Sequence, residues 1–119
     1  IEKAAAAGTF PDLFDADGMN AAIMVVEALR APDGAADADS LRAALEGLTF
    51  EGPKGTVEIR AEDHVAIQDM YIVKLLNVDD PEFKYYEYVD TVRPQPPCVL
   101  EGDFTARCGG LPTGSLTGS

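Results

Sequence analysis

Three acidic residues near the start of the chain are spaced so that they could share a metal ion. Asp12, Asp15 and Asp17 would offer carboxylate oxygens, the ligands that calcium prefers. The segment lacks the glycine and the bidentate glutamate of an EF-hand loop. Capping of a helix and compensation of its dipole by Asp15 and Asp17 explain the same residues without a cation. We therefore predict no metal and no cofactor.

The single histidine, His64, follows Glu62 and Asp63, a combination that could exchange protons. A histidine in a polar turn is more often a solvated or locally hydrogen-bonded residue, and no serine or cysteine nucleophile stands in a recognisable motif with it. The segment Gly52-Pro53-Lys54-Gly55 has the pattern of a tight turn rather than of a phosphate loop. The sequence therefore predicts a protein that is not an enzyme.

Two aromatic residues, Phe10 and Phe14, stand just before a predicted helix. The N-terminus of a helix exposes amide donors that can hold an anionic group such as a carboxylate. This arrangement indicates a small-ligand site, although a hydrophobic staple or an ordinary core contact explains the same rings.

The two cysteines, Cys98 and Cys108, lie in one stretch rich in proline and glycine. No nearby histidine and no second cysteine pair could complete a zinc site, so a local disulfide is the favoured interpretation over two free thiols. Closing a loop of about ten residues would stabilise the fold by roughly 3 kcal/mol. Because disulfides persist in oxidising compartments, the pair favours export from the cytoplasm.

The composition excludes a nucleic-acid partner. The 119 residues include 21 acidic and 9 basic ones, which leave a formal net charge of −12. Nucleic-acid binding requires basic clusters that displace counterions from phosphates. No apolar run approaches the roughly 18 residues that a membrane span needs.

A helix from Asp15 or Asp17 to Arg30, capped by one of these aspartates, is the first element that could position these groups. Its apolar residues recur at a spacing of three and four, which predicts one buried face. That face would consist of Met19, Ala22, Ile23, Val26 and Leu29.

A second helix is predicted, with Asp39 or Ser40 as its cap and Gly47 closing it. Beyond it the pattern becomes that of strands, first at Thr49-Phe50 and then at residues 56–60, across the Gly52-Pro53-Lys54-Gly55 turn.

Two further strands are predicted to pair as a hairpin. Residues 69–78 are dense in apolar residues, which suits a strand buried on both faces, and residues 83–92 are rich in tyrosine and valine. Three prolines then stop the ladder, and the tail from Gly109 is expected to fray. At the other end, residues 1–9 could end a helix begun upstream.

Three segments in succession resemble the closing third of the branched-chain amino-acid-binding proteins. They are a Pro-Asp-x-Phe helix entry at residues 10–22, a Leu-Glu-Gly-Leu helix end with a Gly-Pro-x-Gly turn at residues 41–55, and an Asp-His-x-x-x-x-Asp-Met-Tyr strand entry at residues 63–71. No segment is diagnostic alone, but their order and spacing match over residues 9–92.

The resemblance implies an α/β protein with the type I periplasmic-binding-protein fold, in which two lobes joined by three crossovers close on a ligand like a hinge. This chain would be its C-terminal portion. Residues 1–72 would form the end of the N-terminal lobe. Residues 73–119 would supply the crossover, the final strands and a tail packed on the C-terminal lobe.

One ligand contact of the family is carried over by position. Phe14, five residues before Met19, corresponds to the ring that lines the ligand cleft in relatives, which often have tyrosine where this chain has Met19. Asp17 is a second candidate ligand-binding residue, and helix capping is its alternative role. The segments that usually grip the ammonium and carboxylate groups of the ligand lie upstream of the matched part.

The function that the resemblance implies is that of the extracytoplasmic solute-binding component of an ABC importer. It would bind an amino acid or a similar small carboxylate by hinge closure. Its partners would be that solute, an ABC permease and the remaining part of the binding protein. If the protein is split, that remaining part would be a second chain. The expected location is periplasmic or extracellular, as a processed export product, with a lipid anchor at the cell surface as one form. A ligand-sensing regulatory domain of the same fold is the alternative.

Overall fold

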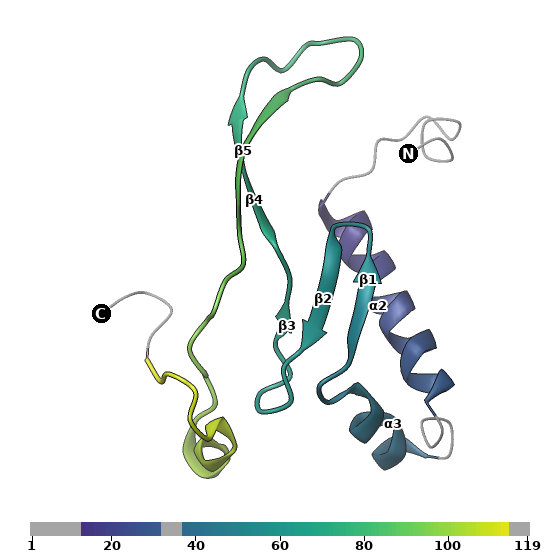
Figure 1. Cartoon of the computed structure of the whole chain (residues 1–119), viewed down its shortest axis with the longest axis vertical. Coiled ribbons are helices and arrows are strands. Elements are labelled where there is room, and N and C mark those ends of the chain that lie inside the picture. Colours follow the sequence, from purple (N-terminus) through teal and green to yellow (C-terminus); the bar gives the residue numbers. More distant parts are fainter. Residues whose placement is uncertain (1–12, 32–36, 115–119) are drawn as a thin grey trace.

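The computed structural model describes residues 13–31 and 37–114, and within them helices and sheets are mixed, as expected for an α/β protein. A three-stranded sheet has the order β1-β2-β3, and a separate two-stranded sheet pairs β4 with β5. Figure 1 shows the helices beside β1 and β2 and the β4–β5 hairpin extending away from them. The elements are α2 (Leu13–Arg30), α3 (Ala38–Leu45), β1 (Thr49–Gly52), β2 (Gly55–Ile59), β3 (Ala66–Ile67), β4 (Met70–Leu75), β5 (Tyr86–Val92) and the 3-10 helix η1 (Gly102–Cys108).

The helix expected from Asp15 or Asp17 is confirmed as α2, but it begins earlier, at Leu13. The prediction that either aspartate caps it is therefore wrong. An N-cap stands before the helical residues with a non-helical backbone, whereas Asp15 lies in the first turn and Asp17 beyond it. Asp12, Phe10 and the expected upstream helix end at residues 1–9 lie outside the described residues.

The side of α2 that packs differs from the predicted apolar face. Met19, Val26 and Leu29 are exposed, and of the predicted set Ile23 alone packs against the core. Apolar residues surround much of this helix, so their spacing does not single out one face, and contact with the sheet selects it. The residues of α2 that are buried or packed on the core are Asn20, Ile23, Met24 and Ala28.

The second helix, α3, is also confirmed, but its predicted cap at Asp39 or Ser40 is wrong, because the helix begins earlier, at Ala38. Its N-cap is Asp37, whose side chain accepts a hydrogen bond of 2.8 Å from the Ser40 amide. That bond lowers the pKa of Asp37. Gly47 adopts a positive φ of 78° just beyond the helix, a conformation that glycine takes without steric cost, so its predicted closing role is confirmed.

The core lies between α2 and the three-stranded sheet. β1 and β2 pair antiparallel across the predicted turn, with Phe50 opposite Val57 and Gly52 opposite Gly55. Phe50, Val57 and Ile59 are buried because alternate residues of a strand point to the same face. We refer to α2, α3 and the β1-β2-β3 sheet together as the sheet body.

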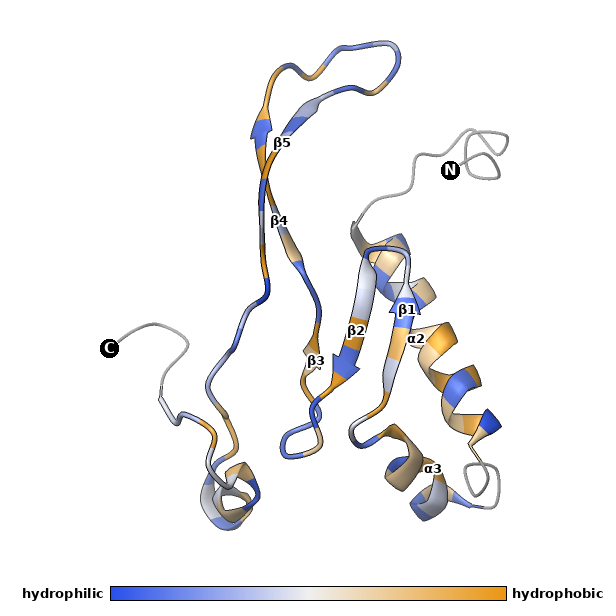
Figure 2. Cartoon of the chain, in the orientation of Figure 1, coloured by the Kyte–Doolittle hydropathy of each residue, from blue (hydrophilic) through white to orange (hydrophobic). Residues whose placement is uncertain are grey.

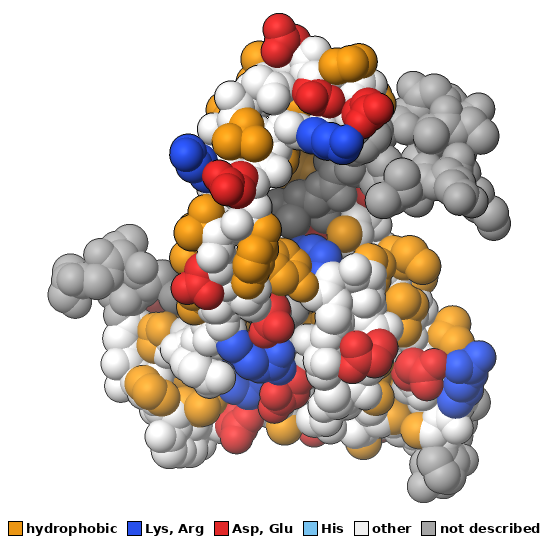
Figure 3. Space-filling model, turned by 45° about the horizontal axis from the view of Figure 1, so that its top comes forward, with side chains coloured by type: hydrophobic (Ala, Val, Ile, Leu, Met, Phe, Trp, Pro, Cys, Tyr) orange, Lys and Arg blue, Asp and Glu red, His pale blue; other side chains and the backbone are white. Residues whose placement is uncertain are grey.

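The predicted pairing of the last two strands is confirmed, but their predicted burial is wrong. β4 and β5 form an antiparallel hairpin with a register shift at Ile72/Val73. Every residue of β4 is exposed, because neither face of this two-stranded hairpin is covered by another described element. Figure 2 shows hydrophobic residues along the hairpin, and Figure 3 shows hydrophobic side chains at the molecular surface.

The predicted disulfide between Cys98 and Cys108 is confirmed, and both residues are buried. The fraying expected from Gly109 onward is wrong for the residues next to it, because the Cys98 amide donates to the Pro112 carbonyl and Leu111 donates to Cys108. Residues 115–119 lie outside the description. In the part of the chain that the structure describes, no helix has the length and apolarity to cross a membrane.

Candidate functional site

The two predicted ligand-binding residues lie near the N-terminal end of α2, on neighbouring positions of its surface. Phe14 is 79% exposed, and the side chain of Asp17 is about half exposed. Residues three apart on a helix are surface neighbours. The structure therefore brings an accessible aromatic ring and an accessible carboxylate to one end of the helix.

Asp17 joins α2 to two other segments of the sheet body. Its Oδ1 lies 3.0 Å from Nζ of Lys54, in the β1–β2 turn, and accepts a hydrogen bond of 3.4 Å from Gln68, between β3 and β4. The bond from Lys54 and then that from Gln68 lower the pKa of Asp17. The carboxylate is thus ionised and already paired with a cation.

A buried amide group continues this network inward. Asn20 is 8% exposed, and its Nδ2 donates a hydrogen bond of 3.1 Å to Gln68 Oε1. Its Oδ1 is buried, has no hydrogen-bond partner among the described residues and lies against Gly52, where any β-carbon would overlap it. Asn20 therefore holds Gln68 from the buried side by a hydrogen bond, while Gln68 donates to Asp17 on the exposed side.

A cavity of about 300 Å³ opens beside this network, between α2 and the sheet. Its polar groups come from Asp17, Asn20 and Gln68, and the rest of its wall is apolar. Such a combination of an apolar wall and a few polar groups is typical of small-molecule sites. The apolar part consists of Ala21, Met24, Phe50, Val57, Ile59 and Ala66.

Sequence reasoning missed Lys54, Gln68 and Asn20 as members of this site. Lys54 was assigned only to a tight turn, and the other two carried no motif. Gln68 contacts Asp17 across 51 positions of the chain and Asn20 across 48. No local spacing encodes such contacts, so the fold alone reveals them.

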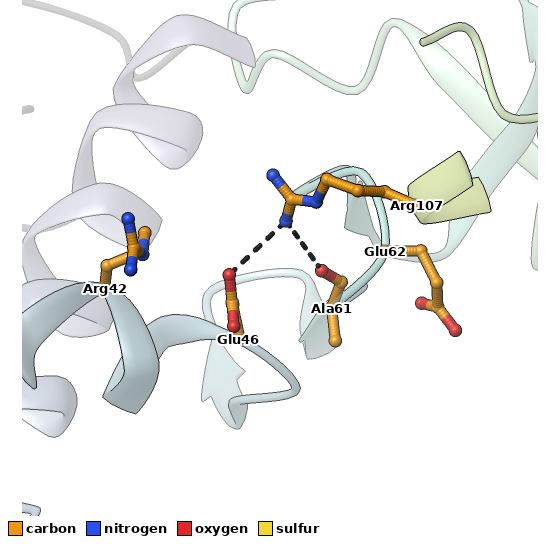
Figure 4. Close-up of a pocket in the computed structure, with 5 residues that line it drawn as sticks. All are labelled: Arg42, Glu46, Ala61, Glu62 and Arg107. Atoms are coloured by element: carbon orange, nitrogen blue, oxygen red, sulfur yellow. Dashed lines mark hydrogen bonds and ion pairs between the residues drawn. The ribbon is translucent and has the colours of Figure 1, made fainter. Parts of the chain in front are cut away.

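A second, open cavity of about 540 Å³ lies where the disulfide loop, residues 98–108, meets α3 and the turn after β2. Figure 4 shows Arg107 pointing toward Glu46 and Ala61. Its Nη2 lies 3.4 Å from Glu46 Oε1 and 3.3 Å from the Ala61 carbonyl. These contacts of η1 are with the sheet body. The packing of the tail on the C-terminal lobe stays a prediction. The charges at this cavity hold the loop in place.

His64 lies at the edge of the same contact. Its Nε2 is 2.9 Å from Glu46 Oε1 and 2.9 Å from Nη2 of Arg107. The His64 bond is the main reason that the pKa of Glu46 is lowered. His64 is hydrogen-bonded, but not locally as expected, because its side-chain partners lie 18 and 43 positions away. Its contacts are those of a docking point for the disulfide loop.

The turn that carries His64 is held by a buried ion pair. Nε and Nη2 of Arg60 donate to the two carboxylate oxygens of Asp63 at 2.7 and 2.5 Å, and Nη1 donates to the Pro96 carbonyl. This bidentate pair lowers the pKa of Asp63. Across residues 13–31 and 37–114, no three His, Cys, Asp or Glu side chains come together in a way that could hold a metal ion.

A family model described as periplasmic binding protein matches residues 1–80. The chain belongs to the periplasmic binding protein family. The match covers more than half of the 119 residues and supports the type I fold and a role in binding a solute. This family is typically non-enzymatic and extracytoplasmic. No curated protein and no solved structure matches the chain.

The matched part includes the network around Asp17 and ends just after β4. Strand β5 and the disulfide loop follow it. All residues of this candidate site in the periplasmic binding protein thus come from the matched part.

Proposed function

We propose that the chain is part of the solute-binding component of an ABC importer, and that its solute is an amino acid or a similar small carboxylate. The observation that carries the proposal is the Asp17–Lys54 ion pair, with the exposed Phe14 three positions before Asp17 on α2. An amino acid carries an ammonium and a carboxylate, which are the complements of these two charges. Phe14 would form an apolar wall beside them.

Hinge closure is the proposed mode of binding. The hairpin leaves the sheet body next to Gln68, which itself touches Asp17. We propose that residues 1–72 belong to the N-terminal lobe and that the chain crosses to the other lobe near Met70 to Lys74. A solute that contacts both lobes would favour the closed population, because a ligand shifts an equilibrium toward the state it binds better.

The remaining part of the binding protein, in the same chain or in a second one, is the proposed cover of the exposed hairpin. The closed form would dock on an ABC permease, at a periplasmic or extracellular location, with or without a lipid anchor. Neighbouring permease and ATPase genes would support import. An adjacent kinase or regulator gene would support the alternative of a ligand-sensing domain.

Replacement of Phe14 by alanine tests the site. In the complete binding protein, Phe14→Ala should weaken solute binding by about 1 to 3 kcal/mol, because apolar burial against the solute is lost. Isothermal titration calorimetry with a panel of amino acids measures the change. Phe104→Ala is the matched control, because Phe104 is an exposed phenylalanine in η1, and it should leave the affinity unchanged. Unchanged affinity in Phe14→Ala would remove this residue from the site.

A further inference from the structure

The chain enters the hairpin from the sheet body and leaves it toward η1, and these two passages lie at the same end of the hairpin, where Met70 pairs with Val92. Residues 68 and 69 alone separate β3 from β4, and Arg93 directly follows β5. Figure 1 shows the hairpin extending from this point. Any change in the angle between hairpin and sheet body must therefore occur around these few residues.

Arg93 connects the two passages to each other and to the sheet body. Its guanidinium lies 3.3 Å from Asp69 Oδ1, on the other passage, and 3.3 Å from Glu58 Oε2, in β2. It also donates to the Thr56 carbonyl at 3.3 Å. A planar guanidinium with several donors can hold three acceptors at once, which a lysine ammonium does less well.

A second contact reaches the hairpin from the β1–β2 turn. The hydroxyl of Tyr71, the second residue of β4, donates to the Lys54 carbonyl at 2.5 Å. The ammonium of the same Lys54 pairs with Asp17. The backbone of this turn therefore contacts the hairpin while its side chain contacts the proposed solute site.

We propose that the Arg93–Glu58 and Tyr71–Lys54 contacts form a latch that sets the angle between the hairpin and the sheet body, and that a solute at Asp17 acts on this latch through Lys54. The second part rests on the proposed function. Asp69 and Arg93 both lie on the passages and can stay paired when the hairpin turns, whereas Glu58 and Lys54 stay with the sheet body.

The latch is built from contacts that can break and re-form. The side chain of Arg93 is 34% exposed and that of Glu58 50% exposed, so water and salt screen their attraction. A buried pair would hold the hairpin in a single position. A solute that draws Lys54 away from Asp17 would shift the turn, and with it the acceptor of the Tyr71 hydroxyl.

The test measures the hairpin angle without solute. In the complete binding protein, dyes on non-natural amino acids at Ala43, in α3, and Val78, near the hairpin tip, would report their distance distribution by single-molecule energy transfer. We expect a shift and broadening of this distribution in the double variant Glu58→Gln/Tyr71→Phe. High salt should shift the wild-type distribution in the same direction, since it screens the ion pair.

Glu87→Gln is the matched control, because it also removes one carboxylate and one ion pair, with Lys74, but within the hairpin. It should leave the distribution unchanged. A double variant that keeps its far-UV circular dichroism and has the distribution of the wild type would overturn the latch. A shifted distribution in a protein that binds no amino acid or small carboxylate would support the latch and refute the proposed function. Solute binding with an unshifted distribution would refute the latch and support the proposed function.

Discussion

At the scale of single residues, the contact between Gly52 and Asn20 shows how a buried side chain restricts its neighbour. The Asn20 amide oxygen occupies the space that a β-carbon on residue 52 would need. Asn20 cannot move away freely, because it is buried and bonded to Gln68. Glycine is therefore required here for lack of space rather than for an unusual backbone angle.

We predict that Gly52→Ala destabilises the fold by about 1 to 3 kcal/mol, the usual cost of overpacking. Urea unfolding of wild type and variant measures the difference. Gly18→Ala is the matched control: in the described part of the chain nothing lies within 4 Å of a β-carbon there, and alanine favours the helix, so stability should stay or rise. In the double variant Asn20→Ala/Gly52→Ala the loss of unfolding free energy should be smaller than the sum of the two single losses. Full additivity would contradict the clash.

Asp63 gives the fold a dependence on acid pH. Its carboxylate is fully buried and bonded to Arg60, which holds its pKa below the ordinary value of 3.8. A carboxyl whose pKa is lowered on folding stabilises the protein above its unfolded pKa, and this contribution is lost as the pH falls through the folded pKa. We therefore expect the contribution to be complete at neutral pH and to disappear below about pH 4.

Replacement of Asp63 by asparagine should cost about 3 to 5 kcal/mol at pH 7, because the buried Arg60 is left without its carboxylate. Denaturant unfolding at a series of pH values should also show a flatter acid limb in this variant. Asp39→Asn breaks the exposed pair with Arg42 and should change stability by less than about 1 kcal/mol. Equal effects of the two substitutions would contradict the role of burial.

At the scale of elements, the disulfide loop shows how the end of the described chain is held to the sheet body. The loop from Cys98 to Cys108 is closed covalently and docks through Arg107 on Glu46 and Ala61. The Arg60–Pro96 bond adds a second contact just before the loop. Cross-linking and docking together hold η1 against Glu46, which follows α3, and Ala61, which follows β2.

Removal of the disulfide in Cys98→Ser/Cys108→Ser should lower the free energy of unfolding by about 2 to 4 kcal/mol, because the unfolded chain regains the entropy that the cross-link removes. Chemical denaturation measures this loss. The same loss should follow reduction of the wild type, and mass analysis after alkylation should find no free thiols before reduction. Two alkylated thiols in the unreduced protein would contradict the bond.

Local patterns predicted the existence and type of most elements but not their contacts. Helical spacing and a glycine stop predicted α2 and α3, and alternation with turn residues predicted the strands. The packed face of α2 was not predicted, since Met19 and Val26 are as apolar as Ile23. Which face is buried depends on the element opposite, and periodicity contains no information about that element.

At the scale of the whole molecule, the structure is flat and extended and measures 51 × 41 × 20 Å. Large apolar side chains are exposed on both faces of the hairpin, an arrangement that marks an interaction surface in soluble proteins. Examples are Ile72, Val73, Leu75, Tyr86, Tyr88 and Val89.

The 119-residue chain by itself should consequently self-associate at micromolar concentration and bind a hydrophobic dye. Sedimentation velocity over a dilution series measures the association. Ile72→Thr/Val89→Thr should reduce both effects, since it lowers the exposed apolar area while keeping strand-forming residues. An isolated chain that stays a compact monomer and melts cooperatively would contradict the need for a further lobe.

The sequence by itself determined the helices, the turns, the strand pairing in each hairpin, the disulfide and membership of a solute-binding family. Each of these depends on residues close together in the chain or on the order of short motifs. The tertiary structure alone brought Asp17, Lys54 and Gln68 together, placed Asn20 behind them and joined Arg93 to β2. Those contacts join segments that are far apart in the chain, and their geometry exists only when the sheet body has packed.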